Sequence, residues 1–331
     1  MKQFKVAVVG ALGAVGTEMM RTLEQRNFPL SGFVPLDAEV NAGKTVQFCG
    51  KDVVVQEAGK GAFSGIDIAL FAVGADVSNV LAPIAVKEGT TVIDNSSAWR
   101  MDPEVPLIIP EVNPEALQKH KGLIANPNCS TIQMLVVAKP LHDAFRIKRI
   151  VVSTYQAVSG SGTPAIMELT SQAKAFAADL PLVNSVYPKQ ILFNAIPQID
   201  DFLEDGYTKE EMKMVNETHK ILDPEIQVSP TAVRVPIYRG HSEALNIETA
   251  MPLTPDAVRE VLSKAKGVKL IDNPSKGEYP TVFDADGNDT VYAGRIRQDY
   301  SIPNGVNMWI VADNLRKGAA LNAVQIAELL L

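Results

Sequence analysis

The hexapeptide Asn-Pro-Asn-Cys-Ser-Thr at residues 126–131 contains one of the two cysteines of the chain. The segment that starts at this cysteine, CSTIQMLVVAKPLHDAF, is predicted to form a helix, which puts Cys129 at the helix N-terminus. The positive end of a helix dipole favours a thiolate and lowers the pKa of a thiol from about 8.5. We therefore expect Cys129 to be a reactive nucleophile and Cys49, in VQFCGKD, to be buried and inert.

A cysteine nucleophile needs a proton acceptor, and the chain has four histidines. His120 and His142 lie in segments that are predicted to be solvated helix faces or ends. His241 lies at a turn between two predicted strands, in RVPIYRGHSEALN, seven residues after Arg234. The residues alone leave two interpretations of His241 open: a surface turn residue or the partner of the thiol.

The glycine-rich stretch GALGAVG at residues 10–16 follows a predicted strand (4–10) and precedes a predicted helix (14–26). Its glycines are three apart, which differs from the usual dinucleotide fingerprint. A strand, turn and helix in this order still allow the backbone to approach a pyrophosphate at the positive end of the helix. A turn that binds nothing is the alternative, and the setting favours a nucleotide.

Discrimination between NAD and NADP usually depends on the end of the second strand, here PLDAEVNAGK at residues 35–44. Asp37 and Glu39 are candidate partners for ribose hydroxyls, and the stretch has no arginine for a 2′-phosphate. These residues favour NAD, unless both acids are simply solvated.

Composition limits the class of protein. A chain of 331 residues is long enough for two domains, and 46% apolar with 21% charged residues is typical of a globular protein. The net charge of −7 argues against nucleic acid and anionic lipid as partners and favours a small molecule. No apolar run reaches the roughly 18 residues that cross a membrane. Glycines interrupt the apolar stretch near the first residue, which differs from a signal peptide. With so few cysteines, we expect a cytoplasmic protein.

The order of predicted elements indicates an α/β protein with two domains. Strands and helices alternate up to residue 128, which predicts a Rossmann-like dinucleotide-binding domain with a parallel sheet (1–128), completed by a C-terminal helix (315–331). Longer strand-like segments in 129–314 predict a second, α+β domain for catalysis and dimerisation, with a large mixed sheet. The predicted strands are 32–36, 67–74, 90–96, 147–159, 227–238, 242–250 and 307–313, with a helix at 75–89 and a long exposed loop at 273–289.

Several segments, in order, resemble the bacterial aspartate-semialdehyde dehydrogenase family. They are DNSSAWRMDPEVPLIIPEVNP, ANPNCSTIQ, YQAVSGSG, NETHKIL, RVPIYRGHSEAL, AGRIRQD and VADNLRKGAALNAVQIAE. The resemblance covers nearly the whole chain. It implies reversible conversion of 4-phospho-L-aspartate to L-aspartate 4-semialdehyde and phosphate with NADPH. This step belongs to the biosynthesis of lysine and diaminopimelate, methionine, threonine and isoleucine.

The resemblance also implies roles for individual residues. Cys129 would form a thioester, His241 would shuttle a proton, and Gln156 would position the reacting group. Arg234 would bind the substrate carboxylate and Glu217 its ammonium. The residues implied to hold the phosphate are Arg100, Asn128 and Lys220.

The cofactor residues implied by the resemblance are Gly10, Leu12, Gly13, Ala14, Val15, Val40, Asn41, Ser159, Gly160 and Asn314. The chain departs from the family at Leu12, where a threonine is usual, and at Val40 and Asn41, where an Arg-Ser pair commonly holds the 2′-phosphate of NADP. NADP stays the first expectation, with NAD accepted as well. No metal is expected. The family implies a homodimer, with a tetramer as the alternative.

Two other functions fit part of this pattern. An N-acetylglutamyl-phosphate reductase would use similar chemistry, but the carboxylate of Glu217 favours a substrate with a free ammonium. A non-catalytic nucleotide-binding relative would have no need of a nucleophile, and Cys129 is present.

Overall fold

A computed structural model describes residues 2–331, and the chain folds into two compact units. The first contains the chain up to Asn128 and again from Ala319 onwards, and the second contains Cys129–Gly318. The sequence analysis expected the return to the first domain at residue 315. Just before Ala319, the side chain of Asp313 accepts the backbone N–H groups of Leu315 and Arg316, and its carbonyl accepts that of Gly318.

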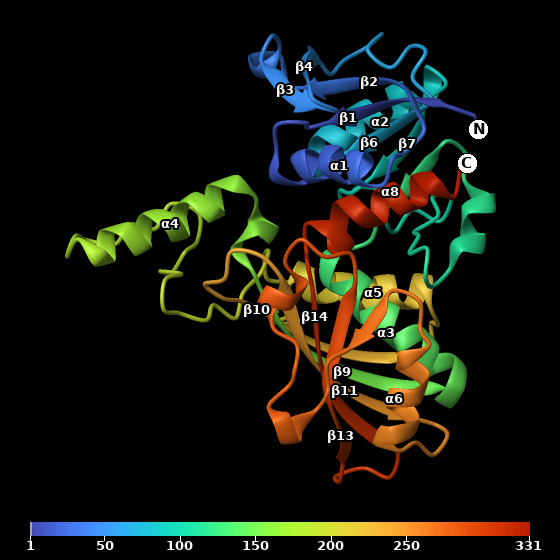
Figure 1. The fold of residues 1–331 in the computed structure, drawn as a ribbon, viewed down its shortest axis with the longest axis vertical. Coiled ribbons are helices and arrows are strands. Elements are labelled where there is room, and N and C mark those ends of the chain that lie inside the picture. The colour runs from blue at the N-terminus through green and yellow to red at the C-terminus, as the bar shows by residue number, and fades with distance from the viewer. Residues whose placement is uncertain (1) are drawn as a thin grey trace. The chain divides into compact units, whose positions relative to one another are not determined.

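The first unit is built on a six-stranded sheet with the order β5-β2-β1-β6-β7-β8, and every pairing in it is parallel (Figure 1). Its strands are β1 (Phe4–Val9), β2 (Leu30–Asp37), β5 (Gln56–Glu57), β6 (Ile68–Phe71), β7 (Thr91–Asp94) and β8 (Leu123–Ala125). The predicted parallel sheet is therefore confirmed. A separate hairpin of β3 (Thr45–Phe48) and β4 (Lys51–Val54) precedes β5.

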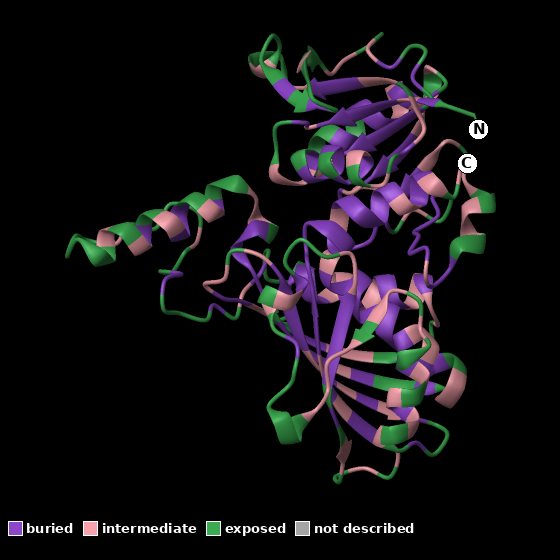
Figure 2. Cartoon of the chain, in the orientation of Figure 1, coloured by how far each residue is buried: buried purple, intermediate pink, exposed green. Residues whose placement is uncertain are grey.

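Helices cover both faces of this sheet. Val6 and Val8 of β1 pack in a core with α1 (Ala14–Gln25) and α8 (Leu321–Glu328). The alternate residues Ala7 and Val9 pack in a second core with α2 (Ala75–Lys87). Because successive strand residues point to opposite faces, a continuous apolar strand is the pattern that a sheet covered on both sides requires. The central strands β1, β6 and β7 are accordingly buried almost throughout (Figure 2).

The second unit is built on a mixed six-stranded sheet with the order β10-β9-β11-β14-β13-β12. The pairs β10/β9 and β12/β13 are parallel, and the other three are antiparallel. This confirms the mixed sheet predicted for the second domain. Its strands are β9 (Ile147–Gln156), β10 (Gln227–Arg234), β11 (His241–Thr249), β12 (Val268–Leu270), β13 (Val291–Asp299) and β14 (Gly305–Ala312).

One face of this sheet is packed against α3 (Cys129–Phe145), α5 (Lys209–Ile221) and α6 (Pro255–Ser263). Helix α4 (Thr163–Ala177) and the loop after it project from the sheet as an arm (Figure 1). The predicted exposed loop at 273–289 contains only short turns, one of which is α7 (Val282–Ala285). No helix within residues 2–331 is long and apolar enough to span a membrane.

Candidate active site

The thiol of Cys129 faces the ring of His241. Helix α3 begins at Cys129 and strand β11 begins at His241, and the distance from Sγ to Nε2 is 3.3 Å. Gly318 lies against the cysteine, because a Cβ added at this glycine would be 2.8 Å from the Cβ of Cys129. A side chain at position 318 would therefore push Cys129 away from its place. The second unit thus brings together two residues that are 112 positions apart in the sequence.

The orientation of His241 is set by the backbone. The N–H of Ala157 donates to Nδ1 of His241 over 3.1 Å, so the neutral ring carries its proton on Nε2, the atom that faces the sulfur. The ring is fully buried. Burial, with the nearby positive charge of Arg234 as a second cause, lowers the pKa of His241 to about 3. A neutral imidazole therefore donates Nε2–H towards Cys129.

Gln156 lies beside His241, because the two residues are paired across β9 and β11. Its amide nitrogen is 3.3 Å from Oγ1 of Thr154 and 3.3 Å from Oε1 of Glu210. The side chain is buried, and Lys213 donates to the other oxygen of Glu210 over 3.0 Å. These contacts fix a neutral amide next to the imidazole.

Arg234 supplies a buried positive charge next to His241. It ends β10 and is paired with Gln156 of β9, and one guanidinium nitrogen donates to the carbonyl of Ala157 over 2.7 Å. Among residues 2–331, no carboxylate pairs with this guanidinium, and its Nε has no hydrogen-bond partner. Gly160 leaves the room beside it, because a Cβ at that position would be 2.9 Å from Arg234 Nη1 and 3.3 Å from the ring of His241. A buried, unpaired guanidinium is costly and fits an anionic ligand.

Glu217 and Lys220 lie on α5, three residues apart, as expected from their spacing. Glu217 is buried and Lys220 is half-buried. The helix starts with a capping box between Thr208 and Glu211, and Glu211 also accepts the backbone N–H of Ala232 in β10 over 2.9 Å. Helix α5 is thereby attached to the strand that ends at Arg234.

Arg100 and Asn128 belong to the first unit. Arg100 is buried and donates to the carbonyls of Asn126 and Asn95 over 2.9 and 2.7 Å. Asn322 of α8 donates to the side chain of Asn126 over 2.7 Å. The loop that leads to Asn128 and Cys129 is therefore held by an arginine and by the returning C-terminal helix. The sequence analysis assigned no role to Asn322 or Gly318, although both lie in the segment VADNLRKGAALNAVQIAE that carries part of the resemblance.

The glycine turn of the first unit is as tight as the sequence suggested. Gly10 has φ +80°, and a Cβ there would be 2.5 Å from the carbonyl oxygen of Ala72. A Cβ on Gly16 would be 2.1 Å from the carbonyl oxygen of Gly10. Helix α1 follows with Gly13 at its N-cap, so no side chain covers the first turn at Ala14 and Val15. Free N–H groups at a helix start fit a pyrophosphate.

The end of β2 carries a polar cluster. The carboxylate of Asp37 accepts the N–H of Leu12 over 3.1 Å and the side-chain amide of Asn41 over 2.7 Å. Lys44 donates to the other end of the Asn41 amide over 2.6 Å. Val40 is exposed. Asp37 is thus partly engaged by its own loop, and a lysine that the sequence analysis did not single out stands beside Asn41.

Ser159 and Asn314 contact each other in the second unit. The Asn314 amide nitrogen donates to Ser159 Oγ over 3.0 Å, and its oxygen accepts the N–H of Gly240 over 2.8 Å. Gly240 precedes His241. The pair predicted to lie near the cofactor therefore also holds the loop that leads into His241.

Two expectations from the sequence are wrong. Cys49 is exposed rather than buried, because it occupies the turn between β3 and β4 with φ 49°. His142 is buried rather than solvated. The Nε2 of His142 is 3.3 Å from the carboxylate of Asp223, because the last turn of α3 packs against the loop that follows α5.

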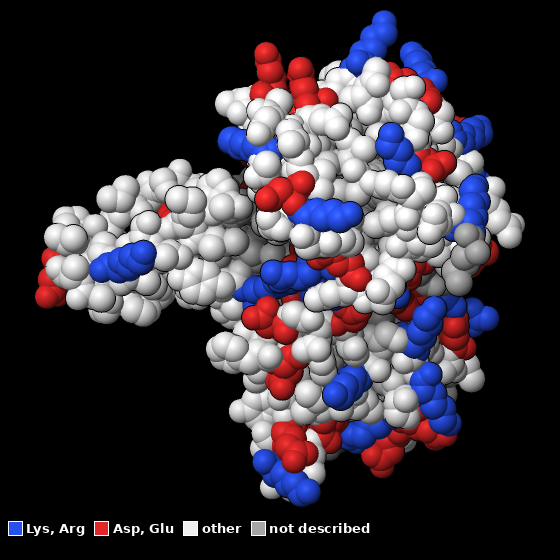
Figure 3. Space-filling view, turned by 45° about the horizontal axis from the view of Figure 1, so that its top comes forward, with Lys and Arg blue, Asp and Glu red and all other residues white. Residues whose placement is uncertain are grey.

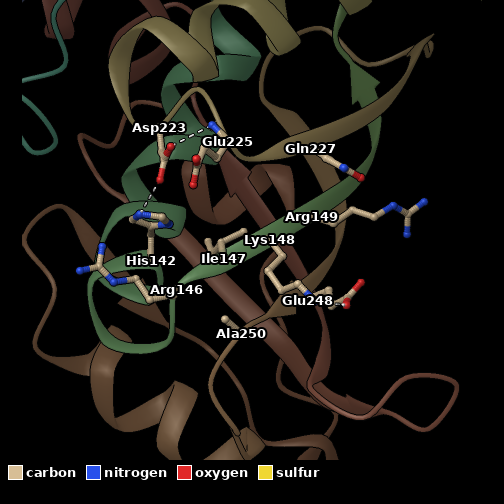
Figure 4. Close-up of a pocket in the computed structure, with 10 residues that line it drawn as sticks. All are labelled: His142, Arg146, Ile147, Lys148, Arg149, Asp223, Glu225, Gln227, Glu248 and Ala250. Atoms are coloured by element: carbon tan, nitrogen blue, oxygen red, sulfur yellow. Dashed lines mark hydrogen bonds and ion pairs between the residues drawn. The ribbon is translucent and has the colours of Figure 1, made fainter.

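A cavity of about 620 Å³ lies at the opposite ends of the strands that carry Gln156, Arg234 and His241 (Figure 4). It contains none of the predicted site residues. Its lining is His142, Arg146, Ile147, Lys148, Arg149, Asp223, Glu225, Gln227, Glu248 and Ala250. No group of three or more His, Cys, Asp or Glu side chains in residues 2–331 could hold a metal ion.

Comparison with known proteins gives a consistent family. Residues 5–120 match the family described as "Semialdehyde dehydrogenase, NAD binding domain", and residues 138–317 match "Semialdehyde dehydrogenase, dimerisation domain". An aspartate-semialdehyde dehydrogenase of Aquifex aeolicus is 54% identical over 99% of this chain and 98% of its own length. The crystal structure of aspartate semialdehyde dehydrogenase II of Vibrio cholerae, complexed with ASA, is 49% identical. It covers 100% of this chain and 98% of its own chain, with a TM-score of 0.97. The enzyme of Candida albicans, solved with NADP, is 25% identical over 99% and 98% of the chains, with a TM-score of 0.77.

The buried neutral ring of His241 makes stability depend on pH. In the unfolded chain a histidine binds a proton below about pH 6.5, whereas the folded ring does not until about pH 3. The unfolded state therefore binds more protons between these values, and the free energy of unfolding falls as the pH falls from 6.5. We expect the parent to lose about 1.5 kcal/mol more than His241→Gln between pH 6.5 and 5. Urea unfolding at each pH measures this difference, with His120→Gln as the control that keeps the parent slope.

Proposed function

Because the chain belongs to the aspartate-semialdehyde dehydrogenase family, we propose that Cys129 and His241 carry out the covalent chemistry of this enzyme. The reaction interconverts 4-phospho-L-aspartate and L-aspartate 4-semialdehyde plus phosphate, in the biosynthesis of lysine, methionine, threonine and isoleucine. A nicotinamide cofactor is the redox partner. The single observation that supports these roles most is the 3.3 Å distance between Sγ and Nε2.

In the biosynthetic direction, the Cys129 thiolate attacks the acyl carbon of the substrate. A C–S bond forms, the bond from carbon to the phosphate oxygen breaks, and phosphate leaves. The cofactor, when bound, supplies a hydride to the carbonyl carbon of the resulting thioester. The oxygen on that carbon then expels the thiolate, which releases the aldehyde. Nε2–H of His241 donates first to the thiolate and then to the developing oxyanion, so the proton is held at that atom.

The charges of the site match the ions of the substrate. The unpaired guanidinium of Arg234 suits the carboxylate, and the carboxylate of Glu217 suits the ammonium. Arg100, Lys220 and Asn128 remain the proposed phosphate ligands. A carboxylate on Arg234 also offsets part of the positive field that lowers the pKa of His241. Substrate binding would thereby raise the pKa of the imidazole, while Nε2–H remains the donor to the sulfur.

The proposed cofactor is NADP, with NAD accepted. Ala14 and Val15 would offer their N–H groups to the pyrophosphate. Asn41 and Lys44 would take the place of the missing Arg-Ser pair, because a lysine is a point charge that suits a phosphate. Asp37, which favours NAD, already accepts three hydrogen bonds, from Leu12, Ala38 and Asn41. Ser159, Gly160 and Asn314 remain proposed contacts near the nicotinamide.

We also propose a homodimer, formed through the second unit. The outer face of its sheet carries Tyr155 and Trp309, whose rings are 5.2 Å apart, and Tyr155 is exposed. The α4 arm adds exposed Met167, Phe176 and Phe193, and the arm shows few charges in Figure 3. These residues lie within the part of the chain that matches the dimerisation domain.

A cytoplasmic location is proposed for the enzyme.

Replacing the nucleophile tests the chemistry. Cys129→Ala should reduce phosphate-dependent oxidation of L-aspartate 4-semialdehyde by at least about 10⁴-fold, because no thioester can form. The assay follows reduction of NADP at 340 nm, and circular dichroism checks the fold. Cys49→Ser is the control and should keep the parent rate. Substantial activity in Cys129→Ala would refute the role of the sulfur, and a parent enzyme that turns over only N-acetylglutamate semialdehyde would support the rival reductase.

Cofactor preference tests the cluster at the end of β2. We expect a higher kcat/KM for NADP than for NAD in the parent enzyme. Lys44→Ala should lower kcat/KM for NADP about tenfold and leave that for NAD within about twofold, since only NADP carries the 2′-phosphate. Lys51→Ala, an exposed lysine of the β3–β4 hairpin, is the matched control. Equal losses with both cofactors would contradict the assignment.

Light scattering tests the dimer. The parent should have twice the mass of one chain at micromolar concentration. Tyr155→Glu should shift it to a monomer, because it puts a charge on the proposed apolar interface. Val80→Glu adds the same charge to an exposed residue of α2 in the first unit and should remain a dimer. A parent that is monomeric at all concentrations would overturn the proposal.

A further inference from the structure

Glu243 is a buried acid for which the reaction has no use. It lies in the central strand β11, is fully buried, and neither carboxylate oxygen has a hydrogen-bond partner among residues 2–331. The Gln133 side chain on α3 is also fully buried, and its amide nitrogen and oxygen are equally without partners in that part of the chain. Buried polar groups without partners are rare and require an explanation.

These two residues repeat the arrangement of the catalytic pair. Cys129 and Gln133 are four positions apart on α3, so they lie on one face of the helix, about 6 Å apart along its axis. His241 and Glu243 are two positions apart on β11, so they point to the same face of the sheet, about 6.5 Å apart. Two pairs of residues therefore face each other between α3 and β11. Cys129 lies opposite His241, and Gln133 lies opposite Glu243.

Burial raises the pKa of Glu243 well above its usual range, and the nearby Gln133 side chain, although it is not in hydrogen-bonding geometry, opposes the rise. Burial therefore favours the protonated, neutral form of the acid. Its neighbours in the same row of the sheet are Thr154 on β9 and Ile310 on β14, and neither is charged. A neutral carboxylic acid and a primary amide each offer one donor and one acceptor, so a small rotation joins them by two hydrogen bonds.

We propose that Glu243 and Gln133 form a crossbar between β11 and α3 that positions Cys129 against His241. The inference rests on the proposed nucleophilic role of Cys129. An apolar pair would fill the same space but would not define the position of α3 along β11. A single buried polar contact can define such a position, because a shift would leave its polar atoms without partners. The next position on this face of β11, farther from His241, is apolar: Leu245 is paired with Val152 on β9. Glu243 is therefore the last polar residue on this face before the apolar core.

The rate at which iodoacetamide alkylates Cys129 tests this positioning role, measured from pH 5 to 9 in a Cys49→Ser background. Glu243→Gln keeps a neutral polar group of the same length, and we expect the rate, its pH midpoint and kcat to stay within about twofold of the parent. Glu243→Leu removes the crossbar at similar volume. We expect about tenfold losses in alkylation rate and kcat, an upward shift of the pH midpoint and a KM within about twofold.

Leu245→Ala is the matched control, because it opens a cavity at the next buried position of the same face of β11. It should lower stability to urea and leave the pH midpoint of alkylation at the parent value. Gln133→Leu should reproduce Glu243→Leu, and the double variant should lose little more than either single variant.

Three results would overturn the crossbar. A tenfold loss in Glu243→Gln would mean that the carboxyl itself takes part in proton transfer. A parent-like pH midpoint in Glu243→Leu, or an equal shift in Leu245→Ala, would mean that the pair only fills the core. Failure of the underlying function is recognised separately, because Cys129→Ala would then keep its activity.

Discussion

The site depends on the contact between the start of one helix and the start of one strand. Cys129 is the first residue of α3 and His241 is the first residue of β11, and their side chains meet at 3.3 Å. Both terminal positions are fixed by the backbone or by glycine. Ala157 donates to the imidazole, and Gly318 leaves room for the cysteine. A small shift of either element would separate the sulfur from its hydrogen-bond donor.

The charges around this contact are incomplete without a substrate. Arg234 is buried with no carboxylate beside it in the described part of the chain, and its field helps to keep His241 neutral. Glu243 lies on the same face of the sheet, and burial raises its pKa, which favours the protonated form. The protein thus leaves the guanidinium of Arg234 without a paired carboxylate where we propose that an anionic substrate binds. The carboxylate of the proposed substrate would then neutralise the charge of Arg234, which has no ion-pair partner in the folded chain between residues 2 and 331.

Polar contacts within the first unit hold the loop that leads to Cys129. Asn126 receives hydrogen bonds from Arg100 and Asn322, and its own amide donates to Asn95 over 2.8 Å. Asn322 belongs to α8, which packs with α1 on one face of the parallel sheet. The end of the chain therefore supports the loop before Cys129, which gives a physical reason for its return to the first unit.

The sequence by itself determined the parallel and mixed sheets, the tight glycine turn and the place of Cys129 at a helix start. These features depend on local periodicity and on glycines whose Cβ atoms would clash. Only the tertiary structure decided which polar residues are buried. His142 and His241 occur in similarly polar segments, and the packing of α3 and the pairing of β9 with β11 bury both. Cys49 looked like a core residue but occupies a hairpin turn. Burial is a property of contacts between segments far apart in the chain, so no local pattern could reveal the Gln133 and Glu243 pair.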